Sequence, residues 1–159
     1  MNLESIYKDG DRLPEKYANI GVKSGLGQNI SPLFKWDEPP VGVKSFALIM
    51  VDYEAVSGHF IHWLVIDIPA DVDEMPEGAS LTVGMPDGSR ELNTDYRRPG
   101  YGGGRPPVGT GDHGYKTTVY ALNVERLDIQ PDIGLAEFEA ELAGKVLAAA
   151  DLTAIYSQD

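Results

Sequence analysis

Five side chains beside apolar stretches of the chain could carry chemistry: Asp52, Glu54, His62, His113 and Tyr115. Imidazole changes charge near neutral pH, so two histidines with carboxylates nearby could support acid–base, metal-assisted or ligand-binding chemistry. Asp52 and Glu54 lie at the end of the apolar run 44–52, and a spacing of two predicts that both carboxylates point to the same side of a strand. Taken one at a time, spacing alone favours a structural role for each group, as a solvated strand-end carboxylate or a satisfied core or loop histidine.

His62 lies inside a second apolar run, 60–68, where strand alternation predicts that it faces away from its neighbours Ile61 and Trp63. His59 precedes it by an odd spacing, which sends the two rings to opposite faces of a strand. A chelate formed by these two histidines is therefore not expected. Two histidines with two carboxylates still leave a hydrolytic or oxygenase metal site open as a less favoured alternative.

The stretch 98–123 joins a segment that cannot be regular structure to one that is typical of a strand. Its many glycines adopt backbone angles closed to other residues, while Pro106 and Pro107 fix φ and remove two N–H donors. Such a loop has a defined shape. It delivers His113 and Tyr115 to the start of a β-branched and aromatic run, where a ligand could approach the backbone.

Several well-known motifs are absent or out of context. Residues 109–114 fit the GxGxxG pattern, but they lead into an expected strand instead of opening a helix, so no dinucleotide site is predicted. The sequence has no GxxxxGK[ST] motif and no GxSxG motif. Ser57 near His59 lacks the strand-turn-helix that would orient a nucleophile.

The elements that must position these residues are mainly strands. The expected strands are 44–52, 60–68, 116–124 and one within the tail 145–156. A helix is expected over 135–143, with Gly144 placed to end it. Residues 1–20 predict an edge strand plus coil, and the acidic connection 70–100 predicts at most one short strand. The chain therefore predicts a single domain, 1–159, folded as a mainly β, antiparallel β-sandwich of two sheets with a helix near the C-terminus.

Composition narrows the function. The 159 residues can bury a sizeable core, and the lack of cysteine excludes disulfides and thiolate metal sites. A formal charge of −12 argues against general binding of nucleic acid or of anionic lipid. The sequence contains no apolar run of membrane-spanning length, and its first residues do not form a signal peptide. We therefore expect a cytoplasmic protein with no integral membrane segment and no cofactor.

Five segments, in order, resemble the phosphatidylethanolamine-binding protein family, also called Raf-kinase-inhibitor-like proteins, in its bacterial and archaeal branch. The similarity covers about residues 13–156. The segments are GVKSFALIMVD, HWLVIDIPAD, RPGYGG, RPPVGTGDHGY with VYALNV, and VLAAADLTAIY.

The resemblance implies a two-sheet antiparallel sandwich with a small pocket at one end that holds phosphate-like or carboxylate anions. The ligand-binding residues that it implies by position are Asp52, Glu54, His62, Gly104, Arg105, Pro106, His113 and Tyr115. In that arrangement His113, the Tyr115 hydroxyl and glycine amides would donate to the anion, while the carboxylates would hold the imidazoles.

The chain also departs from the family pattern. Asp52-Tyr53-Glu54-Ala55-Val56 stands where the family usually has Asp-Pro-Asp-Ala-Pro, and Gly114 replaces an arginine between His113 and Tyr115. Arg105 adds a cation at the rim, at a position where the family supplies a backbone N–H. We expect Arg105 to strengthen anion binding.

The expected function is therefore non-enzymatic binding of a small anionic or phosphorylated ligand, with no catalytic residue and no metal. The resemblance implies that a kinase or protease could be a protein partner and that the chain could form a homodimer. Two alternatives stay open. One is an enzyme that uses His62, His113 and the carboxylates, with or without a metal. The other is a peptidase-inhibitor module that makes its contacts through an exposed loop.

Overall fold

A five-stranded antiparallel sheet forms the middle layer of the molecule. The computed structural model describes residues 1–159. The strand order is β6-β4-β3-β7-β8. The bounds are β3 Ser45–Asp52, β4 Phe60–Pro69, β6 Arg90–Glu91, β7 His113–Leu122 and β8 Val146–Tyr156. Strands β3 and β4 are central and buried on both faces, as their unbroken apolar runs predict.

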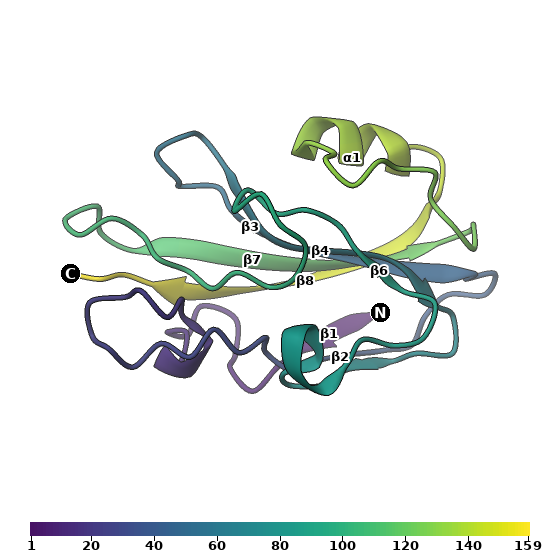
Figure 1. Cartoon of the computed structure of the whole chain (residues 1–159). Coiled ribbons are helices and arrows are strands. Elements are labelled where there is room, and N and C mark those ends of the chain that lie inside the picture. Colours follow the sequence, from purple (N-terminus) through teal and green to yellow (C-terminus); the bar gives the residue numbers. More distant parts are fainter.

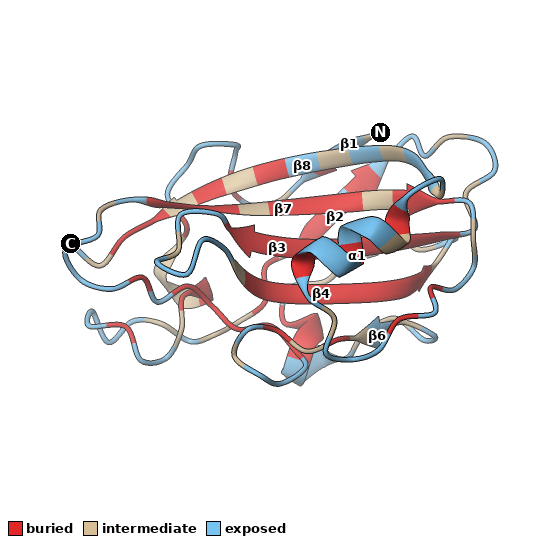
Figure 2. Ribbon diagram, turned by 90° about the horizontal axis from the view of Figure 1, so that it is seen from above, coloured by how far each residue is buried: buried red, intermediate tan, exposed pale blue.

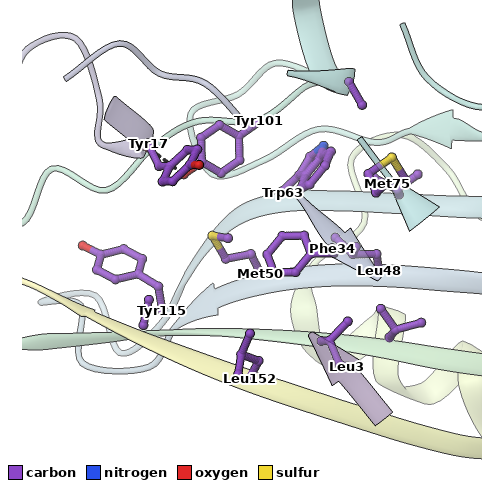
Figure 3. Packing of buried hydrophobic residues seen from close by; sticks show 14 of the residues in the cluster. Leu3, Tyr17, Phe34, Leu48, Met50, Trp63, Met75, Tyr101, Tyr115 and Leu152 are labelled. Atoms are coloured by element: carbon purple, nitrogen blue, oxygen red, sulfur yellow. Dashed lines mark hydrogen bonds between the residues drawn. The ribbon is translucent and has the colours of Figure 1, made fainter. Parts of the chain in front are cut away.

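A small three-stranded sheet covers one face of the large sheet (Figure 1). It consists of β1 Asn2–Glu4, β2 Phe34–Asp37 and β5 Glu74–Met75, in the order β1-β2-β5. A cluster of 23 buried apolar residues fills the space between the sheets. Phe34 of β2 and Trp63 of β4 lie in it with ring centroids 6.4 Å apart, next to Met50 (Figure 3). The predicted two-sheet antiparallel sandwich is confirmed.

The opposite face of the large sheet is covered by α1, Leu135–Leu142 (Figure 2). Leu135, Phe138 and Leu142 face a second core of 13 buried residues against β3 and β4. Gly144 has φ of 76°, a left-handed conformation that suits the residue after a helix end. The helix thus lies over the sheet, and β8 follows it directly. No helix of the chain is long and apolar enough to cross a membrane.

Three expectations about the elements need correction. The third long strand begins at His113 instead of Lys116 and ends at Leu122, because pairing with both β3 and β8 extends order into the loop. The connection 70–100 holds two short strands, β5 and β6, and a π-turn over Ala79–Val83, where one short strand at most was expected. Strand β2 has no counterpart among the expected strands, since four residues of alternating polarity give a weak signal.

Candidate ligand-binding site

A pocket of about 460 Å³ opens at the end of the large sheet where β3 ends and β4 and β7 begin. The loop from β3 to β4, the loop into β7 and the C-terminus gather at this end of the molecule (Figure 1). One row of paired residues crosses the floor, because Asp52 pairs with both Phe60 and Tyr115. The lining residues are Asp52, Ala55, Val56, Ser57, Phe60, His62, Tyr96, Arg105, Pro106, Pro107, His113 and Tyr115.

His62 is brought to the pocket by a β-bulge. Met50 pairs with Trp63 and Val51 pairs with Ile61, so His62 is the extra residue on β4. Ile61 therefore packs in the core below α1, while Trp63 packs between the two sheets. His62 lies on the same side as Trp63, so the prediction that it faces away from both neighbours is wrong for Trp63. The bulge breaks the alternation on which that prediction depended.

The His62 ring is neutral and has a defined proton position. Its Nδ1 lies 2.7 Å from the carbonyl oxygen of Gly102, which can only accept, so Nδ1 carries the proton. Burial lowers the pKa of His62 to about 4, opposed in part by this hydrogen bond. The rings of Phe60, Tyr96 and Tyr115 surround it, with centroids 4.8 to 5.7 Å away. Nε2 is left with a lone pair that can accept a hydrogen bond from a ligand.

Asp52 and His113 form a buried pair beside His62. The Oδ2 atom of Asp52 lies 2.7 Å from Nδ1 of His113, and both side chains are only 3–4% exposed. The other oxygen of Asp52 accepts a hydrogen bond of 2.8 Å from the backbone N–H of Glu54. On the far side of the ring, Nε2 of His113 lies 2.8 Å from the hydroxyl of Thr110. Both ring nitrogens of His113 therefore have partners within the chain.

Tyr115 and Gly104 meet at the base of the pocket. The Tyr115 ring lies at one edge of the core, with its hydroxyl directed away from Met50 (Figure 3). Burial, and secondarily the charge of Asp52, raises the pKa of this phenol, so it is a neutral donor. A Cβ at Gly104 would lie 2.7 Å from Cζ of Tyr115, which explains why the chain has glycine there. The backbone at Gly104 thus lies so close to the Tyr115 ring that an alanine side chain would not fit between them.

The segment 102–105 runs beside the pocket, and of its four residues Arg105 belongs to the pocket lining. Gly102 donates to the carbonyl of His62 over 2.9 Å, and the carbonyl of Gly103 accepts from the Tyr96 hydroxyl over 2.7 Å. The backbone N–H groups of Gly104 and Arg105 have no acceptor within the chain. The guanidinium of Arg105 makes no ion pair and lies over Gly21, where a Cβ would come within 2.4 Å of its Nη1. The segment thus places a positive charge in the pocket lining and two N–H groups without an acceptor at or beside it.

The family model described as phosphatidylethanolamine-binding protein matches residues 4–157. The chain belongs to the phosphatidylethanolamine-binding protein family. It is 39% identical over 157 residues to the UPF0098 protein YbhB of Escherichia coli, covering 98% of each chain. It is also 38% identical over 153 residues to a UPF0098 protein of Aquifex aeolicus. That alignment covers 96% of this chain and 85% of the Aquifex protein.

Solved structures give the same result. The E. coli protein YbcL, described as a member of the mammalian PEBP family, has a TM-score of 0.89 at 29% identity, with 98% of this chain and 97% of YbcL covered. A carboxypeptidase Y inhibitor solved with its cognate proteinase has a TM-score of 0.51 at 18% identity, covering 92% of this chain and 74% of the inhibitor. The second comparison shows the shared fold alone. The resemblance stated from the sequence is confirmed.

In this family member, two of the sequence-predicted residues, Glu54 and Gly104, do not line the pocket. Glu54 is exposed and does not line the pocket, and its Oε1 accepts a hydrogen bond of 2.9 Å from the N–H of Gly114. The expected common direction of Asp52 and Glu54 fails because β3 ends at Asp52, so strand alternation does not continue into the turn. Gly104 touches Tyr115 without lining the pocket. The other six predicted residues line it.

Sequence reasoning missed the aromatic wall and the partner of His113. Phe60 opens an apolar run, and its position at the strand start next to the polar loop was a signal that could have found it. Tyr96 reaches the site through a turn in which Thr94 accepts from the N–H of Arg97, and nothing in its local pattern indicates this. Thr110 lies between two glycines of the shaped loop. No three His, Asp or Glu side chains converge to hold a metal ion.

Proposed function

We propose that the chain binds a small anionic or phosphorylated ligand in this pocket and does not transform it. The observation that carries the proposal is a set of donors without an acceptor in the chain: the Tyr115 hydroxyl and the N–H of Arg105, both residues of the pocket lining, and the N–H of Gly104 beside them. Gly104 is buried, and a buried N–H without a partner costs free energy comparable to a lost hydrogen bond. An anion that accepts from these groups would remove that cost.

The charges around the pocket favour a ligand that is an anion and also carries a hydrogen-bond donor. In a chain of formal charge −12, the guanidinium of Arg105 is a local cation that makes no ion pair. His62 presents a lone pair, and Asp52 places negative charge beside it, so this part of the floor favours a hydrogen-bond donor. A phosphate monoanion, or a phosphoryl group that carries an ammonium nearby, offers both the negative oxygens and the donor.

The apolar wall favours a ligand that is more than a bare ion. Phe60, Val56 and the two prolines at 106 and 107 line the same pocket as the polar groups. A volume of about 460 Å³ is within the usual range for small-molecule sites, which are mostly apolar with a few placed polar groups. The ligand class that fits is a phosphorylated small organic molecule.

Isothermal titration calorimetry with inorganic phosphate and with phosphoethanolamine tests the proposal. We expect Tyr115→Phe to weaken binding of both about tenfold, since it removes one hydrogen bond to a charged group. Tyr120→Phe is the matched control, because Tyr120 lies on the same strand and packs against Phe138 on the opposite face. Equal affinity of the wild type and Tyr115→Phe, or no binding by the wild type, would refute the proposed site.

Recovery of phosphoethanolamine unchanged after incubation, followed by 31P NMR, is expected for a binding protein, and release of phosphate would favour the enzyme alternative. A protein partner such as a protease is supported by the shared fold with a carboxypeptidase inhibitor, which is a likeness of fold alone. Inhibition that survives in a His62→Ala, Tyr115→Phe variant would assign that role to an exposed loop. A cytoplasmic location and a homodimer belong to the same proposal, and cell fractionation and light scattering test them.

A further inference from the structure

A threonine of the loop into β7 occupies the outer nitrogen of His113. The Oγ1 atom of Thr110 lies 2.8 Å from Nε2 of His113 and 2.7 Å from the carbonyl oxygen of Pro107. Its backbone N–H also points to Pro107, at 3.3 Å. Thr110 therefore belongs to a tight turn whose side chain closes back on the pocket histidine.

Counting protons shows what this contact does. The carboxylate of Asp52 can only accept, so Nδ1 of His113 carries a proton. Thr110 has one hydroxyl proton and two neighbours, His113 and the acceptor carbonyl of Pro107. When the hydroxyl donates to Pro107, Nε2 of His113 must donate to Thr110, and the ring is an imidazolium paired with Asp52. In either arrangement, an anion that needs the Nε2 proton competes with Thr110.

The last two residues of the chain hold this turn in place. The carboxylate of Asp159 accepts from the N–H of Gly109 and, over 2.7 Å, from the N–H of Gly111, which flank Thr110. These two hydrogen bonds, Gly109 first, lower the pKa of Asp159. Gln158 donates to the carbonyl of Pro106 over 2.6 Å and accepts from the N–H of Lys23 over 2.7 Å. The C-terminus lies at this end of the molecule (Figure 1).

We infer that Thr110 stands in for the ligand on His113, and that Asp159 is the positioning residue that holds it there. The inference rests on the proposed anion site and deepens it, because it adds a competitor built into the chain. Binding of a phosphoryl oxygen at His113 then requires the turn 107–111 to move away. Pro107, Val108, Gly109 and Thr110 are exposed, so the turn can move without disturbing a core. The hydrogen bonds of the Asp159 carboxylate to Gly109 and Gly111 keep the turn in contact with His113.

Titration of inorganic phosphate into Thr110→Val is the first test. Valine keeps the shape of the side chain and removes the hydroxyl, so phosphate should bind about three- to tenfold more tightly, the worth of one displaced hydrogen bond. Thr110→Ser keeps the hydroxyl and should bind as the wild type does. An affinity of Thr110→Val equal to or below that of the wild type overturns the inference.

Asp159→Ala provides the second test. Loss of the carboxylate should free the turn and tighten phosphate binding in the same direction, and the double variant with Thr110→Val should bind no more tightly than Thr110→Val alone. Asp37→Ala is the control of equal charge change, since Asp37 receives the backbone N–H of Asn2 on the small sheet, outside the pocket. If Asp37→Ala tightens binding as much, the effect is net charge and the role of Asp159 is overturned.

The 15N chemical shifts of the His113 ring report directly on the contact with Thr110, and a purely structural role of Thr110 or Asp159 would not change them. Thr110→Val should change the Nε2 shift, Asp159→Ala should change it in the same direction, and Asp37→Ala should leave it unchanged. Separate results distinguish the two proposals. If the wild type binds phosphate and Thr110→Val binds no better, the inference fails and the proposed function stands. If neither binds phosphate, both fail.

Discussion

Asp52 and His113 form a buried hydrogen-bonded pair at the ends of two neighbouring strands, with 2.7 Å between Oδ2 and Nδ1. Asp52 ends β3, and His113 begins β7. Removing one member of a buried pair leaves the other without its partner, which is far more costly than breaking an exposed pair. The pair therefore ties the floor of the pocket to the stability of the large sheet.

Asp52→Ala should lower the free energy of unfolding by about 3 kcal/mol, because it also removes the acceptor of the Glu54 N–H. Urea unfolding at neutral pH measures this. Glu54→Ala is the comparison, since Glu54 is exposed and accepts one hydrogen bond, from Gly114, so its loss should cost about 1 kcal/mol. Equal costs for the two variants would show that the buried pair contributes little.

The buried His62 should make stability depend on pH. Burial lowers its pKa to about 4 in the folded protein from 6.5 for an exposed histidine, so the unfolded chain binds more protons between these values. Stability is therefore lost as pH falls through 6.5 towards 4, by about 2 kcal/mol between pH 7 and pH 5. His62→Gln should remove this part of the slope in urea unfolding, whereas His59→Gln, at an exposed position, should retain it. A His59→Gln slope that matches His62→Gln would contradict the assignment.

Gly104 tests how closely the segment 102–105 fits against Tyr115. In Gly104→Ala the new Cβ would lie 2.7 Å from Cζ and 2.8 Å from the hydroxyl oxygen of Tyr115, so the phenol must shift. We expect a loss of about 1–3 kcal/mol in the free energy of unfolding and at least about tenfold weaker phosphate binding. In Gly134→Ala the nearest atom would be 3.7 Å away, and this control should bind phosphate as the wild type does. Unchanged binding by Gly104→Ala would separate Tyr115 from the ligand.

The sequence predicts the parts of the fold whose signal is local. Strands β3 and β4 are continuous apolar runs, and a glycine with positive φ, Gly144, follows shortly after the end of α1, so each can be found from its own residues. Strand β2 is different, because its four residues become a strand only through pairing with β1 and β5. Its partners lie far from it in the sequence, and a local pattern cannot show that pairing.

In the site, too, some features follow from local sequence patterns and others depend on pairing between distant residues. Asp52, His113 and Tyr115 lie at the ends of strands that the sequence indicates, and β3 to β7 pairing brings them together. The side of the sheet that His62 faces depends on a bulge, and the bulge depends on which residue of β3 pairs with Trp63. The partner of the other nitrogen of His113 depends on a turn held by the chain's last residue. These contacts join residues that are distant in the sequence, so they cannot be predicted from the pattern of a single sequence.

Arg105 should act through its charge at the pocket rim. Because it is exposed and makes no ion pair, Arg105→Ala should leave the free energy of unfolding within about 0.5 kcal/mol and weaken phosphate binding about fivefold. The difference should shrink as salt rises above about 0.15 M, where charges are screened within about 8 Å. Arg126→Ala is the control of equal charge change, since Arg126 is exposed and lies near Asp67, towards the opposite end of β4.

Gly21→Ala offers a second route to the same effect, because the new Cβ would displace the guanidinium of Arg105. Calorimetry in which both arginine variants lose equal affinity would assign the effect to net charge, and an unchanged Arg105→Ala would remove the cation from the site.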